Sequence, residues 1–587
     1  MKRKITGIFL QVIILGLLLS CSSSYTKTVT ILETTDIHGV VLPYDFIENE
    51  TLPSSMASVQ TFIKDVKGES DALLLLDNGD NLQGQPAVYY YNFIDTVSPH
   101  ILSQAMNWMG YDATTAGNHD IEAGHKVYDR LAGEYSFPLL AANAVNQETG
   151  QPYFKPYTII DKEGVRVAVF GLITPAVPTW LPPELYSGIE FRDMLETARE
   201  WMPEILNEKP DLVVGLFHSG WDGRKPDSGE TERFAENGAS AVAYYVPGFD
   251  VIFTGHDHRL ANEYFINAEG DSVLILNGGS RSQNLARADI TIHKEHGRVT
   301  VGKMTGEIID LKDYKADEEF IAKFSNSEKT ITEYVSKTIG NFTSTVSSRD
   351  AYFGSSAFID LIHTIQLGLT GADISFAAPL SFDVSIKEGP VTVSDMFKLY
   401  RFENMLYTMS MTGEEIRKYL EYSYDGWINT MKNGRDYLFR YRLDKEGKPA
   451  LNNGRAFFRN QSYNFDSAAG INYTVDVSKP EGMRVNISSF TNGKPFNLDA
   501  TYKVAVNSYR GNGGGSLITE GAGLTPEEAR NSLIKSTDKD LRYYMMKYFE
   551  AEKTINPEKL NNWKFIPESW IKEAEQREYK LLFGVDK

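Results

Sequence analysis

The sequence predicts an α/β protein built from two domains, on three observations. Its 587 residues exceed what a single hydrophobic core usually serves. From about Val29 to Ile309, short runs of Val, Ile and Leu alternate with longer amphipathic stretches, which is typical of buried strands covered by helices. Several of these runs end in clusters of His, Asp, Asn and Gly, and open α/β sheets bind ligands at the carboxyl ends of their strands.

The apolar runs of the first part are predicted to be buried strands. Each is only a few residues long and is bounded by turn-forming residues. The runs are Val29–Leu32, Leu73–Leu76, Val167–Phe170, Leu212–Leu216, Val251–Phe253 and Val273–Leu276.

A connecting helix and a second α/β domain are expected beyond residue 310. The stretch from Asp310 to Phe320 is charged and has apolar residues at helical spacing. Further predicted features are a helix at Phe358–Ile362, a glycine-rich loop at Gly511–Gly515 and a charged helical segment from Thr525 onwards. We therefore expect a first domain at residues 27–310, a linker helix at 311–343 and a second domain at 344–587.

Composition and charge exclude some classes of protein. Hydrophobic residues make up 42% of the chain and charged residues 23%, which is ordinary for a globular protein and argues against disorder. The formal net charge is −19, which argues against a groove for polymeric nucleic acid, because such a groove needs Lys and Arg to neutralise phosphates. Small anionic substrates remain compatible, since bound metal ions can reverse the local sign of the field.

The N-terminus predicts export and a lipid anchor. A basic start, Lys2 to Lys4, is followed by an apolar run from Ile8 to Leu19 that is too short for a transmembrane helix but suits a signal peptide. The run leads into Leu-Ser-Cys21, close to the signal box of bacterial lipoproteins, and Cys21 is the only cysteine. We expect a signal peptide at residues 1–20, lipidation of Cys21 and a periplasmic or cell-envelope location, with no disulfide in the mature protein.

Five short motifs in the first domain carry potential metal ligands. In chain order they offer Asp36 and His38, Asp80, Asn118, His218, and finally His256 and His258. Carboxylate, imidazole and amide oxygen together suit two divalent ions such as Mn, Zn, Co or Fe. On extended backbone, residues two apart point to the same side, so Asp36 and His38 are expected to face one cavity, as are His256 and His258.

Each motif alone is weak evidence, because short motifs often reflect turn chemistry. The combination is more specific, since five of the ten histidines fall in these motifs: the four named above and His119, which follows Asn118. The remaining histidines lack comparable neighbours and are interpreted as surface or core residues: His100, His125, His293, His296 and His363.

The order Asp-x-His, Gly-Asp, Gly-Asn-His-Asp, His and Gly-His-x-His resembles the calcineurin-like metallophosphoesterases, in particular their 5′-nucleotidase branch. This resemblance implies a four-layer α/β/β/α catalytic domain, a bridging helix and a C-terminal substrate domain. It also implies the ligand sets: Asp36, His38 and His258 for one ion, Asn118, His218 and His256 for the other, and Asp80 bridging both. His258 stands where many 5′-nucleotidases have Gln.

The resemblance also implies a catalytic pair. His119 corresponds to the histidine that stabilises the phosphoryl oxygens or protonates the leaving oxygen. Glu122 stands where relatives have an aspartate that orients this ring, and it keeps the carboxylate with one more methylene.

Two segments of the second domain resemble the family's base-binding site. In the first, Phe402 would stack on the nucleobase and Asn404 would contact it; in the second, Tyr509 would supply the opposite ring. The predicted substrate contacts are Phe402, Asn404, Asn507, Tyr509, Arg510 and Gly513.

The branch is indicated by three further segments. Asn507–Gly515, Phe465–Asp476 and Ser375–Pro379 are similar to bacterial 2′,3′-cyclic-nucleotide 2′-phosphodiesterase/3′-nucleotidases. Typical 5′-nucleotidases have an Arg-bearing segment after the last of these, whereas Phe382 and Asp383 follow here. We expect hydrolysis of 2′,3′-cyclic nucleotides to 3′-nucleotides and then to nucleoside and phosphate. The alternatives are a 5′-nucleotidase or nucleotide-sugar hydrolase, and an anchored binding protein with an inactive site; metal identity, base preference and oligomeric state stay open.

Overall fold

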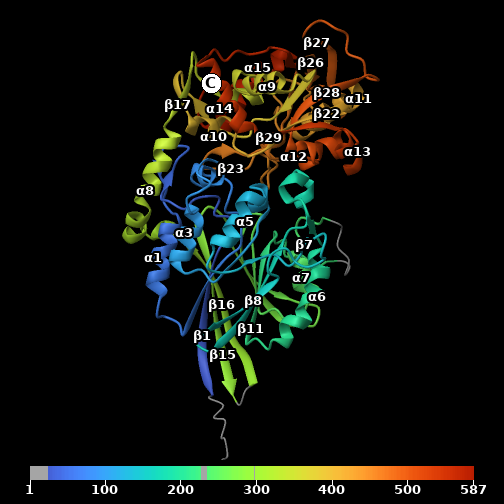
Figure 1. Cartoon of the computed structure of the whole chain (residues 1–587). Helices are drawn as coiled ribbons and strands as arrows, with labels where there is room; N and C mark the ends of the chain where they lie inside the picture. The colour runs from blue at the N-terminus through green and yellow to red at the C-terminus, as the bar shows by residue number, and fades with distance from the viewer. Residues whose placement is uncertain (1–23, 227–233, 296–297) are drawn as a thin grey trace, which may run out of the picture.

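The computed structural model describes residues 24–226, 234–295 and 298–587, and it shows two domains joined by a long helix, α8 (Glu318–Val335; Figure 1). The last strand of the first domain ends at Asp310, so α8 lies within the predicted linker. The predicted signal peptide and Cys21 lie outside the described residues. Within the described ranges, no helix is both long enough and apolar enough to cross a membrane.

Two six-stranded sheets form the centre of the first domain. In spatial order, the first consists of β16 (Arg298–Asp310), β15 (Asn284–Glu295), β1 (Tyr25–Thr34), β4 (Ala72–Asp77), β5 (Ala113–Thr115) and β6 (Leu139–Leu140). The second consists of β13 (Leu260–Ile266), β14 (Ser272–Gly278), β12 (Val251–Thr254), β11 (Leu212–His218), β9 (Val165–Ile173) and β8 (Tyr157–Lys162). All the predicted apolar runs lie within these strands, so those predictions are confirmed.

The two sheets pack face to face because their strands are apolar on both sides. In β4, Leu74 and Leu76 join the core between the sheets, while Leu75 points to the opposite face. In β9, Val167 likewise lies between the sheets and Phe170 faces outward. This is the alternation expected of strands, in which successive side chains point to opposite faces.

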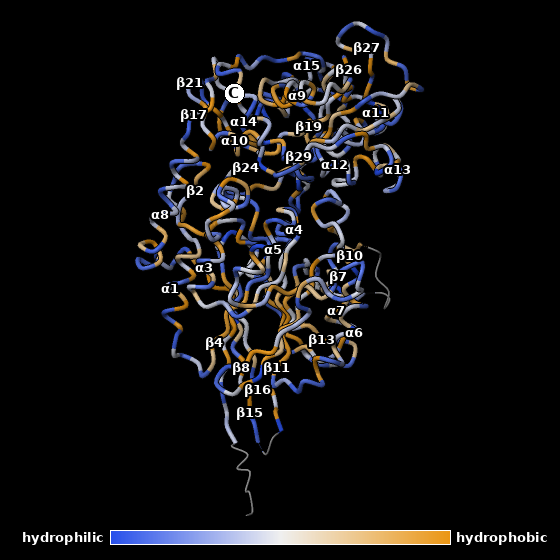
Figure 2. The backbone as a smooth tube through the Cα atoms, in the orientation of Figure 1, coloured by the Kyte–Doolittle hydropathy of each residue, from blue (hydrophilic) through white to orange (hydrophobic). Residues whose placement is uncertain are grey.

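Helices cover both outer faces. Helices α1 (Met56–Val66), α3 (Ile101–Met109), α5 (His125–Glu134) and α8 pack on the first sheet. Helices α6 (Met194–Asn207) and α7 (Ala239–Tyr245) pack on the second. Figure 2 shows the resulting concentration of hydrophobic residues in the sheets at the centre of this domain. The predicted four-layer α/β/β/α arrangement is confirmed.

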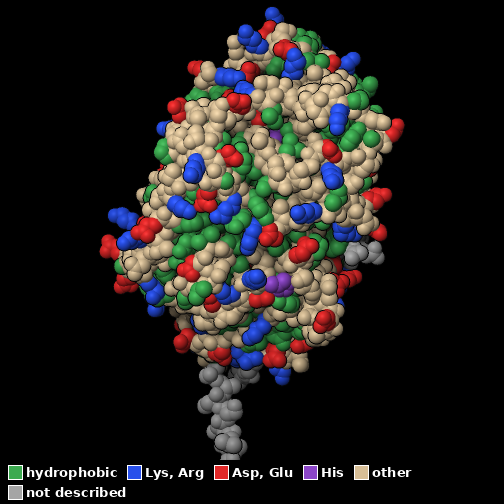
Figure 3. Space-filling view, turned by 45° about the horizontal axis from the view of Figure 1, so that its top comes forward, with side chains coloured by type: hydrophobic (Ala, Val, Ile, Leu, Met, Phe, Trp, Pro, Cys, Tyr) green, Lys and Arg blue, Asp and Glu red, His purple; other side chains and the backbone are tan. Residues whose placement is uncertain are grey.

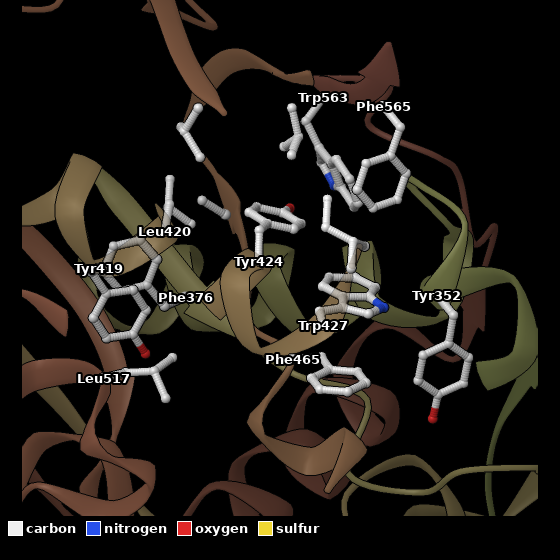
Figure 4. Close-up of a cluster of buried hydrophobic side chains, with 14 of the residues drawn as sticks. Tyr352, Phe376, Tyr419, Leu420, Tyr424, Trp427, Phe465, Leu517, Trp563 and Phe565 are labelled. Atoms are coloured by element: carbon white, nitrogen blue, oxygen red, sulfur yellow. The ribbon is translucent and has the colours of Figure 1, made fainter. Parts of the chain in front are cut away.

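The second domain is built around a five-stranded sheet. Its spatial order is β25 (Ser467–Ala469), β19 (Ile374–Ala377), β28 (Thr501–Asn507), β22 (Met405–Thr412) and β29 (Leu533–Asp540). Helices α9 (Ala357–Thr370) and α11 (Gly413–Trp427) contribute to its cores. In the aromatic core of Figure 4, the Trp427 ring stacks between Tyr424 and Phe465, with centroid distances of 5.1 and 5.2 Å.

The prediction of a wholly helical segment from Thr525 is wrong in part. The segment does contain α13 (Pro526–Asn531), α14 (Leu541–Glu552) and α15 (Glu568–Phe583). It also contains three strands: β29, β30 (Thr554–Ile555) and β31 (Trp563–Ile566). These strands are short or belong to a sheet edge, and their pairing with distant residues is a tertiary effect that local charge patterns do not carry.

A buried arginine joins the domains on the side of α8. Arg542 is fully buried, and its Nη1 donates a hydrogen bond to Glu403 Oε1 at 2.7 Å. Its guanidinium lies 5.0 Å from the ring centroid of Tyr89, which belongs to α2 (Pro86–Tyr89) of the first domain. The Tyr89 hydroxyl donates to Asp540 Oδ2 at 3.2 Å. Tyr89 is therefore built into the core of the second domain, which fixes one edge of the interface.

Candidate metal centre

The predicted metal ligands come together where the two facing sheets end. Parallel strands β1, β4 and β5 terminate at one edge of the first sheet, and β11 and β12 terminate at the corresponding edge of the second. The ligands follow or end these strands: Asp36 and His38 after β1, Asp80 after β4, Asn118 after β5, His218 at the end of β11, and His256 and His258 after β12.

The backbone at these positions is left-handed, so the expectation of an extended backbone is wrong. Positive φ angles occur at Asp36 (49°), His38 (50°), Asp80 (56°), His256 (70°) and His258 (57°). Such conformations cost free energy for residues with a side chain, and they concentrate at functional sites where surrounding structure enforces them. The tight turns still bring Asp36 and His38 into one group of potential ligands, whereas His256 and His258 belong to two different groups.

One group of potential ligands consists of Asp36, His38 and His258, as predicted for the first ion. The Nε2 atoms of His38 and His258 lie 3.0 Å apart. His258 Nε2 lies 3.3 Å from Asp36 Oδ1. Asp36 and His38 are buried whereas His258 is exposed, so this group opens to solvent on the His258 side.

The second group consists of Asp80, His218 and His256, with Asn118 beside it. His218 Nε2 lies 3.1 Å from Asp80 Oδ2 and 3.2 Å from Asn118 Oδ1. Asp80 and Asn118 approach because glycines precede both: a Cβ on Gly79 would lie 2.5 Å from the backbone nitrogen of Gly117. All seven predicted ligands are thus placed in two adjoining groups, and their roles as ligands stay predictions.

Backbone carbonyls orient two of the histidines. His38 Nδ1 lies 3.0 Å from Gln83 O, and His218 Nδ1 lies 2.6 Å from Asn78 O. A proton on Nδ1 satisfies each carbonyl and leaves the Nε2 lone pair for a metal ion. Burial lowers the pKa of His38 to about 3, which favours the neutral form that metal binding requires.

The donor set fits two divalent metal ions. Each group combines imidazole nitrogens with a carboxylate, and Asn118 adds an amide oxygen. Mixed nitrogen and oxygen donors suit Mn, Fe, Co or Zn better than Ca or Mg. Asp80 is placed to serve both groups, because its charge acts on His38 of the first group as well as on His218 of the second.

His119 and Glu122 form a hydrogen-bonded pair next to these groups, on α4 (Asn118–Glu122). His119 Nδ1 lies 2.5 Å from Glu122 Oε2, and the His119 ring centroid lies 5.5 Å from that of His38. Burial disfavours the charged imidazole, but the charges of Asp80 and Glu122 outweigh burial and raise the pKa of His119 to about 10. In the absence of metal, the ring is therefore protonated at neutral pH and able to act as a proton donor.

Of the predicted substrate contacts, Phe402 and Tyr509 are half-buried in the second domain, and Gly513 lies beside the first domain. Phe402 is half-buried and meets the Tyr463 ring edge-on at 6.2 Å. Tyr509 is half-buried on α12 (Ser508–Gly511), and its ring packs so closely on Gly514 that a Cβ there would lie 2.5 Å from it. Gly513 has a φ of 111° and approaches the backbone oxygen of Thr179 in the first domain.

The other three predicted contacts have roles inside the second domain. Arg510 is 1% exposed and binds both carboxylate oxygens of Asp466 at 3.1 Å, together with the backbone oxygens of Gly514 and Tyr463. Asn507 caps α12 by accepting from the Arg510 backbone nitrogen at 2.9 Å, and Asn404 is buried beside Tyr400. Arg510 is thus bound within the second domain, where it shapes the loop, and its role as a substrate contact stays a prediction.

Three residues that the sequence analysis did not single out also lie here. The Trp180 ring stacks on His256 at 5.4 Å, and its backbone oxygen accepts from Asn512 Nδ2 of the second domain at 3.3 Å. Glu236 contacts His256, and Tyr463 contacts Phe402. None of the three belongs to a ligand motif. Their only local signal is that an aromatic or acidic residue stands in a segment between regular elements, which does not identify a functional residue.

Glu33 is a buried carboxyl beneath the centre. It is 0% exposed on β1, and within the described part of the chain neither carboxyl oxygen has a hydrogen-bond partner of normal geometry. Burial raises the pKa of Glu33 well above its usual value of 4.5, and the charges of Asp77 and Asp36 act in the same direction. The folded chain therefore keeps a proton here that the unfolded chain releases.

Glu33→Gln is expected to make the metal-free protein less sensitive to rising pH. Below the usual pKa both states hold the proton, so Glu33 contributes no pH dependence there. Above it, the wild type loses stability up to the raised pKa, whereas Gln cannot ionise. Urea unfolding of both proteins in chelator should show the stability of the variant relative to wild type increasing from pH 5 to pH 8. A constant difference across this range would contradict the prediction.

A four-layer fold that holds two such groups side by side is the architecture of a metal-dependent phosphoesterase, and comparison with known families agrees. Residues 29–260 match the calcineurin-like phosphoesterases, and residues 334–520 match the 5′-nucleotidase C-terminal domain. The first domain is thus a calcineurin-like phosphoesterase domain and the second a 5′-nucleotidase C-terminal domain, and together they indicate a metal-dependent nucleotide phosphoesterase.

Individual relatives are similar over most of the chain. The 2′,3′-cyclic-nucleotide 2′-phosphodiesterase/3′-nucleotidase of Haemophilus influenzae is 27% identical, over 92% of this chain and 87% of its own length. The trifunctional nucleotide phosphoesterase protein YfkN of Bacillus subtilis is 28% identical over 92% of this chain, which spans 39% of that protein. The 5′-nucleotidase precursor of Thermus thermophilus has the same fold, with a TM-score of 0.61, 20% identity, and coverage of 92% and 99% of the two chains.

Proposed function

We propose that the protein hydrolyses ribonucleoside 2′,3′-cyclic phosphates to 3′-nucleotides and then dephosphorylates these to nucleoside and phosphate. The observation that carries this choice is the segment after β19. Phe382 packs against Tyr352 and Phe458, and Asp383 pairs with Arg349 and Arg455. Typical 5′-nucleotidases carry an arginine in this segment. In this chain the corresponding residues make contacts within the second domain instead. The similarity to the Haemophilus protein supports the same choice.

The proposed reaction assigns separate tasks to the residues of the metal centre. Asp36, His38 and His258 would hold one divalent ion; Asn118, His218 and His256 would hold the other; Asp80 would serve both. When bound, such ions lower the pKa of a water molecule and neutralise charge on phosphoryl oxygens. His119, held by Glu122, would donate a proton to the leaving oxygen, first the 2′-oxygen of the cyclic ester and then the 3′-oxygen.

The aromatic residues between the domains would hold the nucleoside. Phe402 and Tyr509 are both half-buried, so part of each ring is accessible to a ligand. Stacking on such rings contributes about 1–3 kcal/mol per base and depends little on base identity. The proposal therefore predicts turnover of nucleotides that carry several different bases.

On the face shown in Figure 3, acidic and basic side chains are interspersed and form no basic patch.

The decisive experiment compares kcat/KM for 2′,3′-cAMP, 3′-AMP and 5′-AMP with Mn²⁺ present. Preference for the cyclic and 3′ substrates is the expected result. Preference for 5′-AMP would retain the metal centre but replace the proposal by the 5′-nucleotidase alternative. Absence of any turnover, with the ions bound, would favour a binding protein with an inactive site.

The proposal includes export and attachment to a membrane through a lipid on Cys21. It rests on the basic start, the short apolar run and the position of the only cysteine. Recovery of a Cys21→Ser variant in the membrane fraction, at the level of the wild type, would rule the anchor out.

A further inference from the structure

His256 is held differently from the other buried histidines of the centre. Its Nε2 lies 2.9 Å from Oε1 of Glu236, a residue of the loop that leads into α7. In the described part of the chain, its Nδ1 has no hydrogen bond. For His38 and His218 the arrangement is reversed, since a backbone carbonyl meets Nδ1. Their Nε2 atoms face other predicted ligands, His258 and Asp80 respectively.

This difference has a chemical consequence for the tautomer. A carboxylate at Nε2 accepts a hydrogen bond, so the proton of a neutral His256 is held on Nε2. The lone pair is then on Nδ1, which is the nitrogen left for a metal ion. Hydrogen bonds from a ligating imidazole to a carboxylate are a recurrent way of fixing ring orientation and raising ligand basicity.

The position of Glu236 is itself well defined. Its backbone oxygen accepts from Thr174 Oγ1 at 2.9 Å and from Ser219 Oγ at 3.1 Å. Ser219 follows the predicted ligand His218, and its Oγ also accepts from the backbone nitrogen of Gly238 at 2.9 Å. The loop bearing Glu236 is thus tied to the end of β11, next to the site. On the other side, Trp180 stacks on the His256 ring with an interplanar angle of 28°.

We propose that Glu236 is a positioning residue for the metal centre: its carboxylate and the Trp180 ring together hold His256 so that Nδ1 binds the second ion. Glu236 reaches no other predicted ligand through a hydrogen bond among the described residues. Its influence is therefore confined to one of the two ions. This inference rests on the two-metal centre of the proposed function and is independent of which nucleotide is hydrolysed.

The test is a titration of metal-stripped full-length protein with Mn²⁺ alone, by calorimetry, which resolves two binding sites. Glu236→Ala should weaken one of the two sites by about 10–100-fold, the range seen when such outer hydrogen-bond partners are removed. The other site should keep its affinity. Glu236→Gln should restore most of the loss, because its amide oxygen can accept the same hydrogen bond from Nε2.

Glu263→Ala is the matched control. Glu263 is also exposed, and its Oε1 accepts from a ring N–H, that of Trp221 at 2.5 Å, but it contacts no predicted ligand in the described structure. This variant should bind both ions as the wild type does.

Three outcomes would overturn the inference. They are unchanged affinity in Glu236→Ala, equal losses at both sites, and a Glu236→Gln variant as weak as Glu236→Ala. Wild-type protein that binds no Mn²⁺ would overturn the metal centre itself. Failure of the substrate comparison would leave this result untouched, so the two proposals fail separately.

Discussion

His119→Ala is expected to lower kcat by about 10²–10⁴-fold, the usual contribution of a general acid. His119 Nδ1 is bound to Glu122, so Nε2 is the ring nitrogen left to act on the ester. The ring is not among the predicted ligands, and both ions should remain bound. Steady-state kinetics with 2′,3′-cAMP and 3′-AMP, together with the metal content of each protein, would measure both parts of this result.

Another His–carboxylate pair of the first domain, His125 and Asp129, provides the control. His125 Nδ1 lies 3.3 Å from Asp129 Oδ2 on α5, but the ring is tied to Ser187 O and away from the ligands. His125→Ala should therefore retain wild-type kcat. A His119→Ala variant within a few-fold of wild type would remove His119 from the chemistry. Loss of the ions would instead show that its hydrogen bonds support the centre.

Asp80→Asn is expected to lower kcat/KM by about 10³-fold or more. Charge stabilisation by metal ions amounts to several kcal/mol, and each 1.36 kcal/mol is a factor of ten in rate. Asp80 is 1% exposed and belongs to the second group, 3.1 Å from His218, and its charge also acts on His38 of the first group. Its replacement removes the negative charge that both ions would share, so the variant should bind both more weakly.

Asp250→Asn is the control, and it tests whether the loss of any largely buried carboxylate is sufficient to weaken metal binding and activity. Asp250 precedes β12 of the second sheet, at the end of that strand away from the ligands, where its Oδ2 accepts from Val213 N at 2.9 Å. Asn can accept the same bond, and this variant should keep its ions and its activity. Full Mn²⁺ occupancy in Asp80→Asn, measured by metal analysis after dialysis, would argue against a shared ligand.

The layers of the first domain were predictable because their signal is local. Runs such as Leu73–Leu76 are apolar on both faces, and only a strand covered on both sides needs that pattern. The strands after Thr525 were missed for the opposite reason. Thr554 and Ile555 of β30 form a strand only because they pair with Asn341 and Phe342, more than two hundred residues away.

The metal ligands were predictable as a set, whereas their supporting residues were not. Asp36 and His38 carry their chemistry in a motif, although the left-handed backbone that aims them was not evident from it. Glu236 and Trp180 have no motif, since their importance arises from contact with His256 in the folded chain. The ion pair between Arg510 and Asp466 was likewise not evident from the sequence, because the two residues are 44 positions apart.

Strand β1 begins at Tyr25, at the end of the molecule away from the second domain, and runs toward the metal centre (Figure 1). At about 3.3 Å per residue, its ten residues measure about 33 Å. In physiological salt the Debye length is about 8 Å. If the proposed anchor at Cys21 exists and β1 stands along the bilayer normal, the metal centre would lie about four screening lengths above the membrane. Anionic nucleotides would then reach the metal centre from bulk solvent, unaffected by the charge of the lipid headgroups.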